Sequence, residues 1–178
     1  HPSLMQGIEE AGFVRCTPIQ AQTLPVALTG RDVAGQAQTG TGKTAAFLVA
    51  IFQNLLSNPP PPTRSATAIR ALVIAPTREL AVQISESCTT YGKYLPLRSG
   101  VVYGGVPMPP QQKMLLAGVE ILIATPGRLL DHAGSKTVNL SQVSILILDE
   151  ADRMLDMGFM PDLKRILALI PKKRQSLL

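Results

Sequence analysis

Tryptophan is absent from this 178-residue sequence, whose aromatic residues are three tyrosines and four phenylalanines. Proteins that hold single-stranded nucleic acids by their bases stack those bases on aromatic side chains. A chain with so few aromatic residues has little capacity for such stacking. If it binds a nucleic acid, we expect contacts to the sugar–phosphate backbone that do not depend on base sequence.

Cysteine is also rare: only Cys16 and Cys88 occur, and their separation fits no metal-ligand spacing. We interpret both as free thiols in a reducing compartment. No apolar stretch approaches the ~18 residues of a membrane span. The N-terminal residues lack the basic-then-apolar pattern of a signal peptide. We therefore expect a cytoplasmic protein with no membrane partner.

Charged residues make up only 16% of the chain and hydrophobic residues 46%, a balance that excludes intrinsic disorder. The 14 glycines and 15 prolines are too few for a low-complexity or collagen-like chain. The length is that of one domain. A net charge of +5 is compatible with a polyanionic partner, but many domains carry as much charge for solubility alone.

Short β-branched runs alternate with longer amphipathic ones, a pattern typical of βαβ units. Strands are predicted at 71–75, 100–103, 119–124 and 144–148, with weaker candidates at 31–35 and 176–178. Helices are predicted at 44–56, 77–91 and 161–170, and the proline-rich stretch 58–63 is predicted to be an exposed loop. We expect one α/β domain with a mostly parallel sheet and helices on both faces.

The strongest chemical signal is the stretch from Ala37 to Thr44, which connects a short strand to an amphipathic helix. Gly40 and Gly42 allow the backbone to curl around a phosphate, and the helix N-terminus attracts negative charge. Lys43 is then expected to contact the β- and γ-phosphates and the Thr44 hydroxyl to bind Mg²⁺. The pattern predicts a nucleoside triphosphate site, although alanine replaces the usual first glycine.

Asp149 and Glu150 directly follow the apolar strand 144–148. Ligands of open α/β sheets bind at the carboxyl ends of strands, so this pair is expected to face the phosphate loop. One carboxylate can hold Mg²⁺ while the other orients or deprotonates the attacking water. Alone, such a pair is more often a solvated strand end or a helix cap; together with the phosphate loop it indicates hydrolysis. No Asn-Lys-x-Asp tetrad is present, which disfavours a GTPase.

These residues, taken together, resemble the DEAD-box ATP-dependent RNA helicases. Residues 149–152 read Asp-Glu-Ala-Asp, and 37–44 match the family's own phosphate loop, alanine included. The other motifs follow in the family's order: the Q motif at 12–20, motif Ia at 76–81, the glycine doublet at 104–105 and motif Ib at 125–128. The resemblance covers essentially the whole chain. It implies the RecA-like P-loop NTPase fold, with 1–178 as the first of two RecA-like domains and the second absent from this chain.

The resemblance also implies a role for each motif residue. Lys43, Asp149 and Glu150 are the implied catalytic residues, and Thr44 and Asp149 hold Mg²⁺, partly through water. The implied nucleotide contacts are Thr17, Gln20, Gln38, Thr39, Gly40, Thr41, Gly42, Lys43 and Thr44. Gln20 would read the adenine edge, since a carboxamide matches its donor and acceptor. The implied RNA contacts are Pro76, Thr77, Arg78, Gly104, Gly105, Thr125, Pro126 and Arg128. Asp152 would couple the nucleotide site to the second domain.

The physics of the RNA-side motifs agrees with these roles. Thr77 and Thr125 are predicted to cap helices whose free N–H groups suit a phosphate, and Arg78 and Arg128 lie in the first turns. The alternatives are arginines paired with nearby acids such as Glu79 or Asp131, and a plain turn at the glycine doublet. Met154, Met157 and Met160 are interpreted as core or rim residues, and His132 has no partner that suggests a site.

The sequence thus predicts the ATP- and RNA-binding half of a helicase that remodels short RNA duplexes by ATP hydrolysis. The chain alone is expected to bind nucleotide weakly and to have little activity. The motifs look most like the bacterial RhlB/RhlE branch, with Cys16 favouring RhlB; this implies partners in RNA decay or ribosome assembly. The alternatives are a P-loop ATPase that acts on DNA or protein, and a non-catalytic nucleotide-binding module.

Overall fold

The structure is a computed structural model that describes residues 1–13, 15–34 and 42–178. Within these ranges the centre of the molecule is a parallel sheet of five strands in the order β2-β3-β1-β4-β5. The strands are β1 (Ala71–Ile74), β2 (Ser99–Val102), β3 (Ile121–Ala124), β4 (Ile145–Leu148) and β5 (Gln175–Leu177). The five corresponding sequence predictions are confirmed, with ends that differ by one or two residues.

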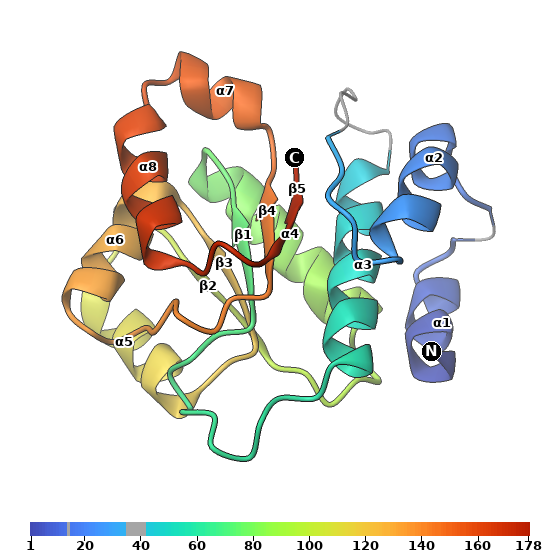
Figure 1. Ribbon diagram of the computed structural model, residues 1–178, viewed down its shortest axis with the longest axis horizontal. Coiled ribbons are helices and arrows are strands. Elements are labelled where there is room, and N and C mark those ends of the chain that lie inside the picture. The colour runs from blue at the N-terminus through green and yellow to red at the C-terminus, as the bar shows by residue number, and fades with distance from the viewer. Residues whose placement is uncertain (14, 35–41) are drawn as a thin grey trace.

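Helices cover both faces of this sheet, as the alternating sequence pattern predicts. They are α1 (Pro2–Glu10), α2 (Pro18–Ala27), α3 (Lys43–Ser57), α4 (Arg78–Tyr91), α5 (Met108–Ala117), α6 (Pro126–Gly134), α7 (Ala151–Asp156) and α8 (Met160–Leu169). Figure 1 shows α3 and α4 on one face and α5, α6 and α8 on the other. None of the helices in the described ranges is long and apolar enough to cross a membrane.

Two hydrophobic cores lie on opposite sides of the sheet because successive strand residues point to opposite faces. Val73 of β1 belongs to the core that contains Phe47 of α3 and Ile84 of α4. Its neighbour Leu72 belongs to the other core, which contains Leu129 of α6. Every residue of β1 and β3 is buried. This explains why these strands read as continuous apolar runs in the sequence.

The weak strand predicted at 31–35 is only partly observed. Val33 forms a single parallel bridge to Leu177 of β5, and residue 35 lies outside the described residues. The bridge consists of hydrogen bonds from Val33 N to the Ser176 carbonyl and from Leu178 N to the Val33 carbonyl, at 3.1 and 2.9 Å. The segment that leads toward the phosphate loop is therefore attached to the edge of the sheet.

The N-terminal helix α1 packs against the end of α4. Gly7 lies so close to the backbone of Tyr91 that a Cβ atom at this position would collide with the Tyr91 carbonyl oxygen. Phe13 then meets the Tyr91 ring edge to face, with centroids 5.4 Å apart. At the surface, Glu10 accepts a hydrogen bond from the Tyr94 hydroxyl and pairs with Lys93.

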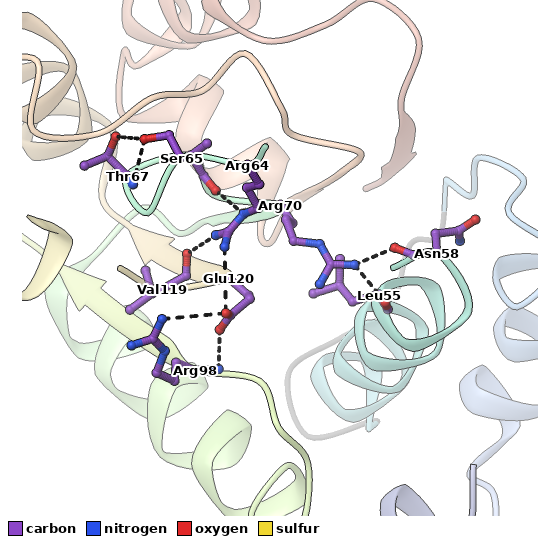
Figure 2. Close-up of polar contacts among 10 residues, drawn as sticks. Leu55, Asn58, Arg64, Ser65, Thr67, Arg70, Arg98, Val119 and Glu120 are labelled. Carbon is purple, nitrogen blue, oxygen red and sulfur yellow. Dashed lines mark hydrogen bonds and ion pairs between the residues drawn. The ribbon is translucent and has the colours of Figure 1, made fainter. Parts of the chain in front are cut away.

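The opposite end of α3 is anchored by a buried arginine. Arg70, which immediately precedes β1, donates through Nη2 to the Leu55 carbonyl at 2.8 Å and the Asn58 carbonyl at 2.6 Å (Figure 2). Its side chain points into the protein, and this burial lowers the pKa of Arg70. Nearby, Glu120 lies 3.9 Å from both Arg64 and the more exposed Arg98.

Candidate functional site

A cleft of about 700 Å³ opens where the chain leaves β1 and β4. It is lined by Phe13, Thr17, Gly42, Lys43, Thr44, Ala45, Leu80, Gln83, Ile84, Ser87, Tyr91, Asp149, Glu150 and Asp152. The structure thus brings the start of α3 and the Asp-Glu-Ala-Asp residues 149–152, about a hundred residues apart in sequence, to one place. Parallel strand order explains the meeting, because the carboxyl ends of all strands lie along one edge.

Gly42 connects the phosphate loop to α3, and its geometry requires glycine for two reasons. Its φ of 85° lies in the left-handed region, which other residues rarely adopt. A Cβ atom there would also stand 2.5 Å from Gln20 Nε2 and 2.9 Å from Thr17 Oγ1. The preceding loop positions Gln38, Thr39, Gly40 and Thr41 lie outside the described residues.

Thr44 and Asp149 meet inside the cleft. The Thr44 hydroxyl donates to Asp149 Oδ2 at 3.3 Å. Burial raises the pKa of Asp149, while the positive charge of Lys43 partly opposes this rise. Two adjacent oxygens suit Mg²⁺, which binds few protein ligands and completes its shell with water and phosphate oxygens. The described residues hold no cluster of three His, Cys, Asp or Glu side chains.

Glu150 follows Asp149 in an unusual backbone conformation. Its φ of 54° and ψ of 49° are left-handed values, which cost a residue with a Cβ roughly 1–2 kcal/mol. The carboxylate pairs with Arg153 at 3.4 Å. Such strain is typical of functional sites, and here it turns the chain sharply from β4 into α7. Glu150 and Asp152 both remain at the cleft wall.

Gln20 is buried and uses both ends of its amide within the protein. Its Oε1 accepts a hydrogen bond from Thr17 N at 2.9 Å, while Thr17 Oγ1 accepts from Gln20 N at 3.4 Å. These two bonds form a capping box at the start of α2. Gln20 Nε2 donates to the Gly42 carbonyl at 3.1 Å, which ties α2 to the phosphate loop. Sequence reasoning missed this capping role, although the Thr-x-x-Gln pattern is its ordinary signature.

The predicted RNA-side residues lie at the same edge of the sheet, after β1, β2 and β3. Thr77 caps α4 by accepting a hydrogen bond from Leu80 N at 3.2 Å, and the Pro76 beside it is buried. Thr125 stands at the N-cap of α6 without a side-chain hydrogen bond. The exposed Arg78 guanidinium lies 4.8 Å from the centre of the Tyr103 ring.

The glycine doublet at 104–105 is exposed, and added Cβ atoms there would meet nothing within 4 Å. Gly105 has a φ of 82°, so this position favours glycine for its backbone. Arg128, in the first turn of α6 after the buried Pro126, donates to the Val106 carbonyl at 2.9 Å and to Gln111 Oε1 at 3.2 Å. It also pairs with Asp131 at 3.5 Å, the alternative that the sequence suggested.

The family model of the DEAD/DEAH box helicases matches residues 17–178. The chain belongs to the DEAD/DEAH box helicase family. Similar proteins include the ATP-dependent RNA helicase RhlB of Xanthomonas oryzae pv. oryzae, which is 54% identical over 181 residues that cover 100% of this chain and 32% of that protein. RhlB of Erwinia tasmaniensis is 49% identical over 177 residues, which cover 99% of this chain and 41% of that protein.

A solved structure supports the same placement in the DEAD/DEAH box family. The crystal structure of a hypothetical ATP-dependent RNA helicase from Sulfolobus tokodaii matches with a TM-score of 0.86 and 37% identity, over 99% of this chain and 49% of that one. The RecA-like fold and the resemblance to bacterial RhlB/RhlE-like DEAD-box helicases, both predicted from the sequence, are confirmed. The chain spans about a third to two-fifths of the curated relatives it matches.

His132 has partners that the sequence did not indicate. Its ring is buried between Gln111 of α5 and Thr137. Both contacts involve residues that no spacing rule relates to position 132. Of the three methionines, Met154 is buried whereas Met157 and Met160 are exposed, which fits their interpretation as core and rim residues.

Proposed function

We propose that this chain is the ATP- and RNA-binding half of an ATP-dependent DEAD-box RNA helicase. The observation that supports this most directly is the cleft that joins Lys43 and Thr44 to Asp149 and Glu150. The exposed glycine doublet and the starts of α4 and α6 follow strands of the same parallel sheet, at the same edge. Nucleotide and RNA would thus bind at neighbouring loops of one rigid sheet.

In the nucleotide site we assign each described residue a chemical task. Lys43 holds the β- and γ-phosphates, and the N-terminus of α3 adds backbone N–H donors. Thr44 and Asp149 hold Mg²⁺, which when bound neutralises phosphate charge. Glu150 orients or deprotonates the attacking water. The second RecA-like domain, a further proposed partner, would supply the arginine fingers that typically contribute 10³–10⁵ in rate.

Gln20 is proposed to read the adenine edge, which requires that its amide exchange at least one of its present bonds to Thr17 and Gly42. Gln20→Ala should then reduce affinity for ADP more than for GDP. Gln22→Ala, at an exposed position of the same helix, is the matched control and should change neither affinity. An equal loss for both nucleotides in Gln20→Ala would contradict base reading.

RNA is the proposed polymer partner, bound through its backbone. The supporting features are the Arg78 and Arg128 guanidiniums, the open glycine doublet and the small number of aromatic side chains. We further propose a cytoplasmic location, supported by the two free thiols. RNA decay or ribosome assembly is the proposed process for the whole protein.

The nucleotide site is tested by isothermal titration calorimetry of Mg·ATP and ADP with the 178-residue chain. Lys43→Ala removes charged hydrogen bonds and should weaken Mg·ATP affinity by about 10- to 100-fold, whereas the exposed Lys164→Ala on α8 should not change it. Unchanged affinity in Lys43→Ala would refute the phosphate-loop assignment.

The polymer partner is tested separately by fluorescence anisotropy with a single-stranded RNA and the DNA of the same sequence. Preference for RNA and loss of affinity with rising salt are expected, because backbone contacts release counterions and the 2′-hydroxyl distinguishes RNA from DNA. Equal binding of DNA would instead favour an ATPase that acts on DNA. Rapid RNA unwinding by these residues alone would contradict the proposal that they are half of the machine.

A further inference from the structure

A buried polar network lies directly behind the proposed RNA-binding loops. The His132 side chain is fully buried on α6, and its ring nitrogens contact Gln111 Oε1 at 3.0 Å and Thr137 Oγ1 at 3.2 Å. Gln111 itself, on α5, is 8% exposed. Polar side chains buried this deeply must satisfy their hydrogen bonds inside the protein, so the network has few alternative arrangements.

The partners of Gln111 determine how its amide is oriented. Its Nε2 donates to the Tyr103 carbonyl at 3.0 Å, while its Oε1 accepts from Arg128 Nη1 at 3.2 Å. Because an arginine can only donate, the end that faces Arg128 must be the oxygen. His132 therefore contacts this oxygen through a protonated Nε2. The Thr137 hydroxyl lies 3.2 Å from Nδ1 and 3.1 Å from the His132 carbonyl, and it donates its one proton to either of these two acceptors. Burial also lowers the pKa of His132, which favours this neutral ring.

The network holds the glycine doublet from both sides. Gln111 binds the carbonyl of Tyr103, which immediately precedes Gly104, and Arg128 binds the carbonyl of Val106, which immediately follows Gly105. Nothing fills the space beside the doublet itself. The doublet is therefore anchored at the carbonyl on either side of it.

Arg128 retains a nitrogen for an external ligand. Nη1 is used by Val106 and Gln111, and Nε lies beside Asp131. Nη2 has no hydrogen-bond partner among the described residues and is not among their buried unpaired atoms. The guanidinium is thus held by hydrogen bonds through Nη1, while Nε pairs with Asp131 without a hydrogen bond. Nη2 can be offered to a phosphate oxygen.

We propose that Gln111, oriented by His132, is a positioning residue for RNA binding. It fixes the glycine doublet relative to Arg128, so that both can contact successive phosphates of one backbone. This inference rests on the proposed RNA binding of the chain. Gln111 is not required to touch RNA, and the nucleotide cleft does not include it.

The test measures single-stranded RNA affinity by fluorescence anisotropy across a range of salt concentrations. Gln111→Met keeps the length of the side chain and removes all three hydrogen bonds. It should weaken RNA binding about tenfold and reduce the slope of log affinity against log salt by about 0.7, the value of one lost phosphate contact on a single strand. Gln112→Met, the neighbouring residue on α5, is the matched control and should change neither.

Coupling distinguishes positioning from general destabilisation. Adding Gln111→Met to Arg128→Gln should weaken RNA binding by less than about twofold more, because both changes disrupt one unit. Mg·ATP affinity should stay unchanged in every variant. If Gln111→Met does not fold, His132 provides the same test: His132→Phe should weaken RNA binding, while His132→Gln, which can place an amide N–H near the position of Nε2, should restore it.

The outcomes separate the two proposals. If the unmodified chain does not bind RNA, both are overturned. If it binds RNA and Gln111→Met behaves like Gln112→Met, or His132→Gln and His132→Phe bind equally, the positioning role alone is overturned. Full additivity of Gln111→Met and Arg128→Gln would likewise overturn it.

Discussion

Replacing Arg70 by methionine should destabilise the whole domain without disturbing the nucleotide site. Arg70 is 7% exposed and donates to the carbonyl of Leu55, in the last turn of α3, and to that of Asn58, the C-cap of this helix. Methionine keeps a linear side chain of similar length and leaves both carbonyls without this donor. Helix ends that are buried without partners for their carbonyls are unfavourable.

The magnitude follows from the two hydrogen bonds. Bonds to a charged donor contribute about 1.5–3 kcal/mol each. Part of this is offset by the cost of burying the guanidinium, which is also what lowers the pKa of Arg70. We therefore expect a loss of about 3 kcal/mol in the free energy of unfolding, which lowers Tm by about 6–12 °C in a domain of this size.

Urea unfolding monitored by circular dichroism measures this loss. Arg98→Met is the matched control, since its guanidinium side chain is 63% exposed and pairs with Glu120 at the surface, where ion pairs contribute at most about 1 kcal/mol. ADP affinity should change less than twofold in Arg70→Met, because α3 has 15 residues and its two ends lie about 22 Å apart. Equal stability of the two variants would refute the anchoring argument.

Three further changes test other features. Gly7→Ala should lower the free energy of unfolding, measured in urea, by about 1–3 kcal/mol, because the added Cβ atom collides with Tyr91. Gly134→Ala adds a Cβ atom that meets open space and should not lower it. Equal effects of the two changes would contradict the close packing of α1. Asp149→Asn should raise the free energy of unfolding by about 0.5–2 kcal/mol, because burial raises the pKa of Asp149 and disfavours its charged form. The same change should weaken Mg·ATP binding. A variant less stable than the unmodified chain would contradict this argument. Because folding lowers the pKa of His132, the free energy of unfolding should fall by up to about 1.4 kcal/mol per pH unit below pH ~6.5. The fall should be smaller in His132→Gln. Identical pH profiles of the two proteins would refute the role of His132 in this pH dependence.

Hydrophobic patterning predicted the elements whose burial is nearly complete. The strand at 71–75 and the helix at 44–56 show clear periods because β1 is buried on both faces and α3 presents a broad apolar side. Patterning failed for α5, which has two prolines in its first turn and buries only Gln111 and Leu115. It also failed for α2, which contains Pro25 and has no pronounced apolar side.

The candidate site likewise has contacts that the sequence could predict and contacts that it could not. The approach of Thr44 to Asp149 could be predicted, because Asp149 directly follows β4 and Thr44 lies in the first turn of α3, the helix that follows the phosphate loop. The bond from Gln20 to Gly42 and the contact between Gln111 and His132 could not, since each joins separate elements through side chains whose directions depend on tertiary packing. The local sequence does not indicate such contacts.

The bridge between Val33 and β5 affects the order in which this chain can acquire its nucleotide site during synthesis. Gln175 and Ser176 bind the segment before the phosphate loop across a separation of 144 residues, through the Arg31 carbonyl and the Asp32 carboxylate. A ribosome adds roughly 5–20 residues per second, so these partners emerge about 7–30 s after the segment they hold. Until then the segment 31–33, which leads into the phosphate loop, cannot pair with β5. A nascent chain should therefore gain nucleotide affinity only when β5 has left the exit tunnel.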